Sequence, residues 1–245
     1  GKILISGGGR CNFTNLGAGP ANYVSENPHF CKSALKRYPP GEFIKLVEKH
    51  GIPYHEKKLG QQFCDHTARD IVDLLQKECE EQGVVFRLGC KVESVRRVAD
   101  DESSASQASD HAAETGAADF RPRFVVTTNQ GDIRAESVVI ATGGLSIPKI
   151  GATGLGYEIA KQFGLALVPT RPALDGFTFA SKDLPFFKEL AGVSVDCTMS
   201  AGGLSFRENL LFTHAGLSGP ASLQASLHWS QGETVTIDLS PDLDL

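Results

Sequence analysis

The chain has 245 residues, of which 41% are hydrophobic and 22% are charged. This composition is typical of a protein that folds around a core, and it excludes a fibrous repeat or a mainly disordered chain. The formal net charge is −5, but residues 100–119 hold six Asp and Glu and no Lys or Arg, so the other 225 residues carry +1. This near-neutral balance predicts no basic face for nucleic acid, and no apolar run is long enough to span a membrane.

Patterns of helices and strands alternate through the first two thirds of the chain. Residues 6–19 are so rich in Gly and Asn that we expect a loop. Apolar residues at helical spacing predict three helices, over residues 42–50, 67–82 and 153–163. Short apolar or β-branched runs predict five strands, over residues 84–86, 91–98, 124–128, 133–135 and 137–141. The last of these strands is continuously apolar and should be buried on both faces, so the fold class is α/β.

The pattern changes near residue 170. Short strand-like runs at residues 193–199, 210–213 and 234–239 are separated by Gly and Pro, with one predicted helix at residues 219–229. We therefore expect two domains, residues 1–170 and a β-rich domain at residues 171–245. The Ser, Ala and Asp-rich residues 100–119 within the first domain are expected to be a disordered acidic loop.

Several familiar catalytic scaffolds are absent from the sequence. There is no P-loop and no H-E-x-x-H, so we expect no metal site. The run Gly216 to Pro220 approaches a nucleophile elbow but has Pro where the last Gly belongs. The six Cys form no C-x-x-C pair, which indicates reduced thiols in a cytoplasmic protein.

Two segments indicate ligand binding. The first is Ser6-Gly7-Gly8-Gly9-Arg10-Cys11-Asn12, in which three glycines allow backbone N–H groups to approach an anion or a flat ring and Arg10 adds a permanent charge. A tight surface turn is the alternative, although a turn needs fewer glycines. The second is Ala141-Thr142-Gly143-Gly144, small residues directly after the predicted buried strand. Ligands of open α/β sheets lie outside such strand ends.

The run from Lys2 to Asn15, KILISGGGRCNFTN, resembles the signature of the HI0933-like (YhiN/BaiN-type) flavoproteins, which are NAD(P)/FAD-dependent oxidoreductases. The resemblance continues in later runs at residues 141–148, 151–157, 169–174 and 210–220. Leu155 departs from it, because the family usually carries a small or acidic residue there. The similarity covers nearly the whole chain.

The resemblance implies an FAD/NAD(P)-binding, Rossmann-like domain of the two-dinucleotide-binding type, into which the β-rich domain is inserted. Such proteins open with a strand, a G-x-G-x-x-G turn and a helix that holds the FAD pyrophosphate. No G-x-G-x-x-G occurs in this sequence. We therefore expect the chain to lack the family's first strand and the last segment that completes the FAD site.

By resemblance, the two glycine-rich segments line the flavin and the strand near residue 92 meets the adenine. The implied cofactor-binding residues are Ser6, Gly7, Gly8, Gly9, Arg10, Cys11, Asn12, Asn15, Val92, Ala141, Thr142, Gly143 and Gly144. Cys11 is either a reactive thiol beside Arg10 or a small packing residue. His214 is either an acid or base or a residue that fixes a turn.

These observations predict an FAD-dependent oxidoreductase that is reduced by NAD(P)H and acts on an unidentified small organic molecule. Its partners would include no nucleic acid and no membrane. One alternative is a truncated, non-catalytic remnant whose nucleotide site is incomplete. A nucleotide-binding module that uses Gly7 to Gly9 as a phosphate loop is a third hypothesis, which the missing P-loop Lys disfavours.

Overall fold

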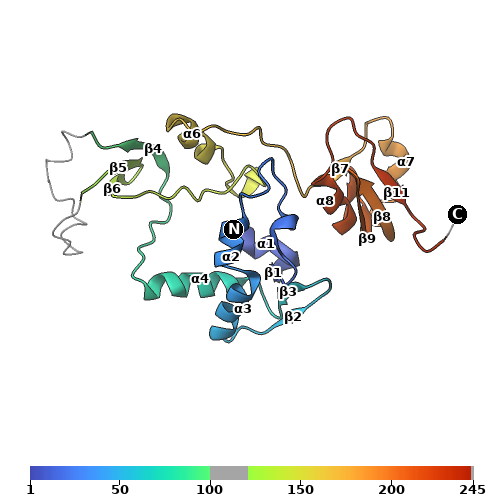
Figure 1. The fold of residues 1–245 in the computed structure, drawn as a ribbon, viewed down its shortest axis with the longest axis horizontal. Coiled ribbons are helices and arrows are strands. Elements are labelled where there is room, and N and C mark those ends of the chain that lie inside the picture. The colour runs from blue at the N-terminus through green and yellow to red at the C-terminus, as the bar shows by residue number, and fades with distance from the viewer. Residues whose placement is uncertain (100–120, 244–245) are drawn as a thin grey trace. The chain divides into compact units, whose positions relative to one another are not determined.

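The computed structural model describes residues 1–99 and 121–243 (Figure 1). The predicted acidic loop at residues 100–119 lies outside the described residues. The chain divides into two units, the first comprising residues 1–17 and 38–168 and the second residues 18–37 and 169–245. No helix in the described part of the chain is long and apolar enough to cross a bilayer.

The first unit begins with a small antiparallel sheet and the helices packed on it. Helix α1 (Lys2–Ile5) and a 3-10 helix (Ser6–Gly9) lead into β1 (Asn12–Asn15). The sheet order is β1-β3-β2, with β2 at Tyr54–Glu56 and β3 at Gln61–Cys64. The expectation of a loop throughout residues 6–19 was therefore wrong, because β3 offers hydrogen-bonding partners to residues 12–15.

Helices α3 (Pro40–Lys49) and α4 (Arg69–Glu81) confirm two helices predicted from apolar spacing. Their buried faces meet in a core of Val47, Cys64, Ile71 and Leu74, which are each at most 2% exposed. The Thr67 hydroxyl oxygen accepts the Arg69 N–H at 3.2 Å at the start of α4. The helix ends before Gly83, whose φ of +70° suits glycine.

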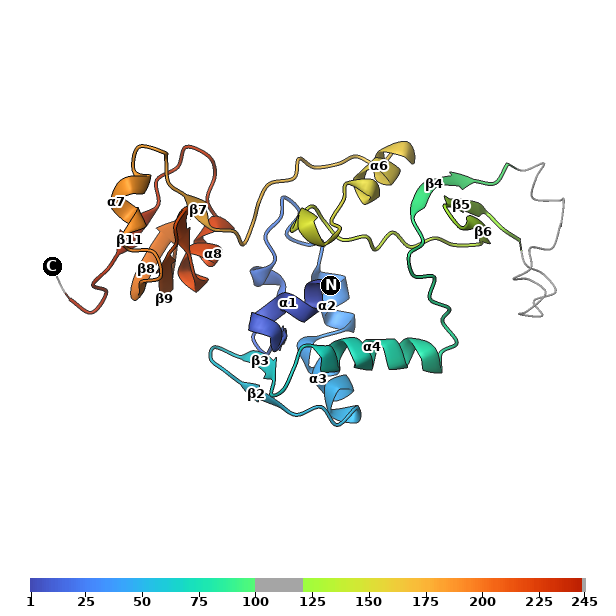
Figure 2. The ribbon, with the colours of Figure 1, turned by 180° about the vertical axis from the view of Figure 1, so that it is seen from behind.

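A second sheet of the first unit has the order β4-β5-β6, with β4 at Val92–Arg97, β5 at Phe124–Thr128 and β6 at Gly131–Ala135. The hairpin between β5 and β6 is confirmed, and its turn is held by the Thr128 hydroxyl, which donates to the Gly131 carbonyl at 2.7 Å. Helix α6 (Leu155–Gln162) confirms the third predicted helix. Both ribbon views show α6 close to β4 (Figure 2).

The predicted strands at residues 84–86 and 137–141 are not strands in the structure. Their apolar side chains lie at the surface instead, with Val85 67% exposed and Val139 86% exposed. A continuously apolar strand needs neighbours on both edges and cover on both faces. No described strand pairs with either segment, and every described pairing is antiparallel.

The second unit contains a five-stranded antiparallel sheet of order β11-β8-β9-β10-β7. The strands are β7 (Phe177–Thr178), β8 (Ser194–Ala201), β9 (Leu204–Phe212), β10 (Gly216–Ser218) and β11 (Thr236–Asp238). The helices are α2 (Lys32–Arg37), α7 (Leu184–Lys188) and α8 (Pro220–Ser226), with short 3-10 turns elsewhere. Strands β8 and β11 and helix α8 fall where the sequence predicts them, whereas β9 begins at Leu204, six residues before the predicted strand at 210–213.

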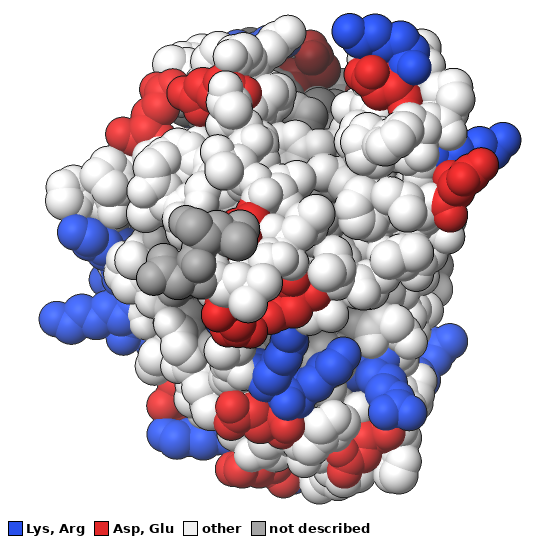
Figure 3. Space-filling view, turned by 90° about the vertical axis from the view of Figure 1, so that its right-hand side faces the viewer, with Lys and Arg blue, Asp and Glu red and all other residues white. Residues whose placement is uncertain are grey.

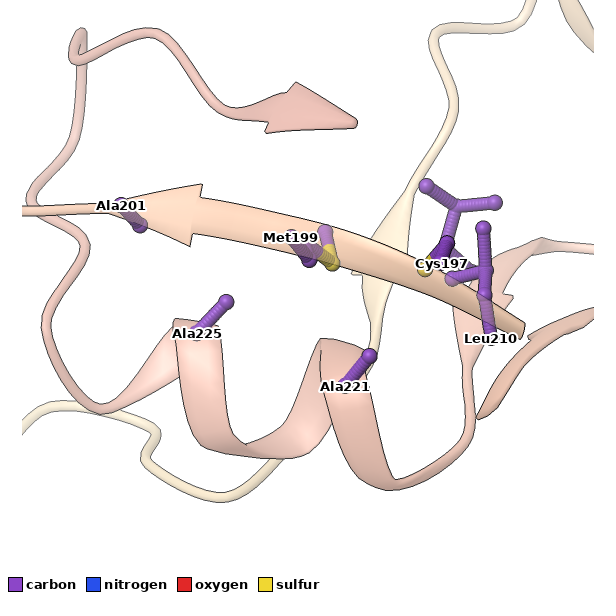
Figure 4. Packing of buried hydrophobic residues seen from close by; sticks show 7 residues of the cluster. Cys197, Met199, Ala201, Leu210, Ala221 and Ala225 are labelled. Atoms are coloured by element: carbon purple, nitrogen blue, oxygen red, sulfur yellow. The ribbon is translucent and has the colours of Figure 1, made fainter. Parts of the chain in front are cut away.

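The core of the second unit lies between the sheet and α8. Figure 4 shows Ala221 and Ala225 of α8 pointing toward Met199 and Cys197 of β8, with Leu210 of β9 beside them. All five residues are fully buried. Two alanines on one face of α8 let the helix lie close to the sheet, so the larger Met199 and Leu210 fill the space between them.

Candidate functional site

The glycine-rich segment is a tight turn with an unusual backbone. Gly7, Gly8 and Gly9 have φ values of +56°, +67° and +86°, and Cys11 has a φ of +50°. The Gly9 carbonyl accepts the Ala68 N–H at 2.7 Å, and the Arg10 carbonyl accepts the Cys64 N–H at 3.0 Å. The end of β3 and the start of α4 therefore fix this turn in place.

The three glycines have different roles. A Cβ at Gly7 would lie 2.7 Å from both the Asn12 backbone nitrogen and the Phe63 ring, so this position requires glycine for packing. A Cβ at Gly8 or Gly9 would meet nothing within 4 Å. These two glycines therefore leave backbone open to a ligand, which fits a flat ring or an anion lying against the turn.

Some polar side chains around the turn are hydrogen-bonded to the backbone, and others are exposed to solvent. The Ser6 hydroxyl donates to the Ile3 carbonyl at 2.8 Å. The Asn15 amide nitrogen donates to the Leu59 carbonyl at 2.9 Å, and its oxygen accepts the Gly17 N–H at 2.8 Å. Arg10 and Asn12 are exposed. The Arg10 and Asn12 side chains are thus accessible from solvent, whereas those of Ser6 and Asn15 are held by backbone groups.

The two cysteines near the turn are buried in the core. Cys11 is 5% exposed and shares a core cluster with Cys64 and Val47. Burial, and to a smaller extent the nearby Cys11 thiol, raise the pKa of the Cys64 thiol to about 11. A thiol with so high a pKa is protonated at neutral pH and is a weak nucleophile.

The second predicted segment lies against the start of α6. A Cβ at Gly156 would lie 2.7 Å from the Thr142 hydroxyl oxygen, and one at Gly144 would lie 3.5 Å from the Tyr157 hydroxyl. The Lys2 ammonium donates a hydrogen bond to the Ser146 hydroxyl, which links α1 to the end of this segment. Ala141, Thr142 and Gly143 are exposed.

The other predicted site residues lie elsewhere. Val92 begins β4 and is paired with Thr128. His214 belongs to the second unit, where it is exposed in the turn between β9 and β10. The adjacent Thr213 holds that turn through its hydroxyl, which accepts the Gly216 N–H at 3.0 Å. The structure thus supports a turn position for His214 and adds no acid or base partner among the described residues.

An open pocket, lined by both apolar and polar side chains, was not predicted from the sequence. It has a volume of about 350 Å³ and lies between the end of α3 and the first half of α4. Its polar lining comprises His50, His66, Asp70, Asp73 and Lys77. Three of these residues recur at i, i+3 and i+7 on α4, a spacing that could have indicated a shared polar face.

Next to this pocket, Glu78 joins α4 to α3. Its carboxylate accepts hydrogen bonds from the Lys49 ammonium at 2.6 Å and lies 2.7 Å from the His50 ring nitrogen Nε2. The bond from Lys49, followed by that from His50, lowers the pKa of the Glu78 carboxyl from its usual 4.5. The His50 side chain is only 7% exposed, so Glu78 holds a nearly buried ring.

Comparison with known proteins identifies the family. The model of the HI0933-like protein Rossmann domain matches residues 1–213. The chain belongs to the HI0933-like family. It is consequently a member of a Rossmann-type flavoprotein family, as the resemblance implied, and FAD binding is the expectation for that family.

Curated relatives match this chain over nearly its whole length. The chain is 52% identical over 245 residues to the ribosomal RNA dihydrouridine synthase of Escherichia coli (strain K12), covering 100% of the chain and 56% of that protein. It is 46% identical over 242 residues to the ribosomal RNA dihydrouridine synthase of Haemophilus influenzae, covering 98% of the chain and 56% of that protein. The chain therefore spans little more than half the length of these relatives.

A more distant relative is the 3-dehydro-bile acid delta(4,6)-reductase of Clostridium scindens. It is 28% identical over 256 residues, covering 99% of the chain and 56% of that protein. All three relatives carry the names of enzymes.

These relatives correct two predictions. The expected small organic substrate and the expected absence of a nucleic-acid partner were wrong, because the two relatives with 46–52% identity are named for ribosomal RNA. The charge argument led to the second error, whereas the expected substrate belonged to the function drawn from the family resemblance. A net charge averaged over 225 residues does not reveal a local group of cations.

Proposed function

We propose that this chain is part of an FAD-dependent enzyme that reduces uridine in ribosomal RNA to dihydrouridine. The observation that carries the proposal is the 52% and 46% identity, over essentially the whole chain, to two proteins named as ribosomal RNA dihydrouridine synthases. The open backbone at Gly8 and Gly9 and the exposed Arg10 agree with a bound flavin cofactor.

The chemistry implied by the relatives' names is the same in kind. Dihydrouridine differs from uridine by two hydrogens across C5=C6, a double bond conjugated with the C4 carbonyl. The name of the bile-acid reductase likewise describes double bonds conjugated with a 3-oxo group. Both reactions add one hydride and one proton to a carbon–carbon double bond that a carbonyl activates. This common reaction class supports a reductase assignment for the chain as well.

The cofactor would supply the hydride when bound, and NAD(P)H is the proposed electron donor. The chain's residues would hold and orient the cofactor. Gly8 and Gly9 would admit a ring or phosphate to the backbone, and the Arg10 guanidinium would face negative charge. Ala141 to Gly143 would offer a second exposed, side-chain-poor surface. Neither cysteine of the turn is proposed as the proton donor, because both are packed in the core.

Three further assignments belong to this proposal. Residues 1–170 would form part of the FAD-binding domain, and residues 171–245 part of a β-rich domain inserted into it. The enzyme would act in the cytoplasm.

The proposal is tested in cells that lack the gene for the full-length protein. Ribosomal RNA from these cells should lose a dihydrouridine that mass spectrometry finds in the parent strain. A plasmid with the intact gene should restore it, and the Gly8→Val variant should not. The Gly83→Val variant is the matched control, because Gly83 has nearly the same φ of +70° and an equally open Cβ position. Unchanged dihydrouridine content after deletion would overturn the proposal.

A further inference from the structure

Lys and Arg outnumber Asp and Glu in strands β4, β5 and β6 and in the described residues that flank them, although residues 100–119, between β4 and β5 in the sequence, hold six Asp and Glu. The whole chain has a net charge of −5, whereas residues 84–99 and 121–136 contain seven Lys and Arg and three Asp and Glu, a net charge of +4. These residues comprise the three strands and the segments that flank them. This local excess is the basic feature that the charge average concealed.

Strand register collects arginines on one face of this sheet. Arg96 of β4 lies opposite Val125 of β5, and Val125 lies opposite Arg134 of β6. Side chains on directly paired residues share a face, and neighbouring strands are about 4.8 Å apart. Arg96 and Arg134 therefore start about 10 Å apart on either side of Val125, which is 1% exposed.

Arg123 adds a third cation to the same face. Its backbone is held on both sides, since its N–H donates to the Ala135 carbonyl and its carbonyl accepts the Val98 N–H, both at 2.9 Å. Strand alternation places Arg123 on the face of Val125. Arg96, Arg123 and Arg134, here called the arginine face, are all exposed. Arg96 has a further interaction, but no described residue forms an ion pair with Arg123 or Arg134.

The opposite face of the sheet is occupied by α6 and the residue that follows it. The Phe163 ring lies 6.2 Å from the Phe124 ring, and the Arg97 guanidinium lies over Phe163 at 5.8 Å. The Gln162 amide donates to the Val95 carbonyl at 2.6 Å. Arg97 therefore packs against Phe163, on the side of the sheet that α6 covers. The arginine face lies on the other side, away from α6.

Surface charge elsewhere is mixed. On the face drawn in Figure 3, Lys and Arg lie beside Asp and Glu around a broad uncharged area. Arg207, for example, is held by Asp196 at 2.9 Å and by Asp242 at 2.7 Å. The neighbouring carboxylates offset the positive charge of such a cation, so its attraction for a polyanion is weak. Arg123 and Arg134 differ because their guanidinium groups have no carboxylate partner among the described residues.

We propose that the arginine face binds the phosphate backbone of the RNA substrate, an inference that rests on the proposed function. Guanidinium groups form paired hydrogen bonds with phosphate oxygens, and a row of them on a rigid sheet fits successive phosphates. Phosphate contacts set the position and orientation of a nucleic acid but do not read its sequence. The arginine face therefore positions the RNA, while choice of the uridine is made elsewhere.

The test uses the full-length protein with FAD bound and an unmodified ribosomal RNA transcript. The variant Arg123→Gln/Arg134→Gln should raise the Kd for the transcript on the order of ten-fold at about 0.1 M salt. The slope of log K against log salt should become shallower by about 1.4 to 1.8, because two phosphate contacts are lost. The control Lys45→Gln/Lys161→Gln removes the same charge from two lysines already paired with Glu42 and Glu158, and should leave Kd and slope unchanged.

Two further readouts separate the possible failures. FAD content and melting temperature should be equal in all three proteins, and at saturating RNA the arginine variant should form dihydrouridine at the wild-type rate. If the wild type forms dihydrouridine but the arginine variant keeps its Kd and salt slope, the arginine face does not bind RNA. If the wild type forms none, the proposed function itself is wrong. If the control loses affinity equally, the effect is one of net charge and the inference fails.

Discussion

At the scale of single residues, the glycine-rich turn shows that neighbouring glycines serve different ends. All three have positive φ, but only Gly7 is closely packed, against Phe63 and Asn12. Sequence reasoning predicted a ligand-binding turn here, and it treated the three glycines alike. The difference arises from β3, which is brought under Gly7 only by tertiary folding. A sequence shows that glycine is present, whereas the packing shows which glycine the fold requires.

Substitution of these glycines should separate folding from cofactor binding. In the full-length protein, Gly8→Ala should cost about 1 kcal/mol for the positive φ and should lower FAD occupancy. Gly7→Ala should cost about 2–4 kcal/mol, because it adds a steric overlap to the same backbone strain. Denaturant midpoints and flavin absorbance measure both effects. Equal stability of the two variants would contradict the packing role of Gly7.

Glu78 makes the stability of the contact between helices α3 and α4 depend on pH. Because its pKa is lowered in the folded protein, its stabilising effect is present above the ordinary value of 4.5 and is lost as the pH falls through the folded value. Glu78→Gln should therefore lower the melting temperature at pH 7, and the difference from wild type should disappear in strong acid.

The control for this prediction is Glu81→Gln, since among the described residues the Glu81 carboxylate has only a long ion pair, with the Lys77 ammonium at 4.0 Å. This control should change the melting temperature much less at pH 7. A Glu78→Gln difference that stayed constant from pH 7 to pH 3 would show that the carboxylate's charge is unimportant.

At the scale of elements, local patterns were predictable and long-range ones were not. The hairpin β5–β6 was predicted from its turn residues, and helices α3, α4 and α6 from apolar residues at helical spacing. Both signals involve residues that are close together in the sequence. The strand expected at residues 137–141 depends on neighbouring strands, and no described strand pairs with it. Apolar character alone therefore predicted burial, but a buried strand also needs partners.

The core of the second unit should be sensitive to loss of volume at one strand position. Leu210→Ala on β9 removes a fully buried side chain between the sheet and α8, and should cost about 2–5 kcal/mol. Leu204→Ala on the same strand is the control, because Leu204 is 47% exposed and should cost no more than about 0.5 kcal/mol. Equilibrium urea unfolding compares the two. A similar small effect at both positions would mean that the helix α8 is not packed as Figure 4 shows.

At the scale of the whole molecule, sequence motifs identified the family but misjudged the substrate. The run from Lys2 to Asn15 and the later runs indicated the family because each is contiguous in the sequence. In the proposed arginine face, strand register brings together residues 96, 123 and 134, which are separated in the sequence by residues 100–119. Only the paired strands show that Arg96 and Arg134 share a face.

The central claim is that this chain belongs to an enzyme that reduces uridine in ribosomal RNA. The most direct measurement incubates the purified full-length protein with FAD, NAD(P)H and an unmodified ribosomal RNA transcript, and then determines nucleosides by mass spectrometry. We predict that dihydrouridine accumulates as NAD(P)H is consumed, and that the Gly8→Val protein forms much less than the Gly83→Val protein. Oxidation of NAD(P)H with no dihydrouridine in the RNA, from a protein that retains its flavin, would contradict the claim.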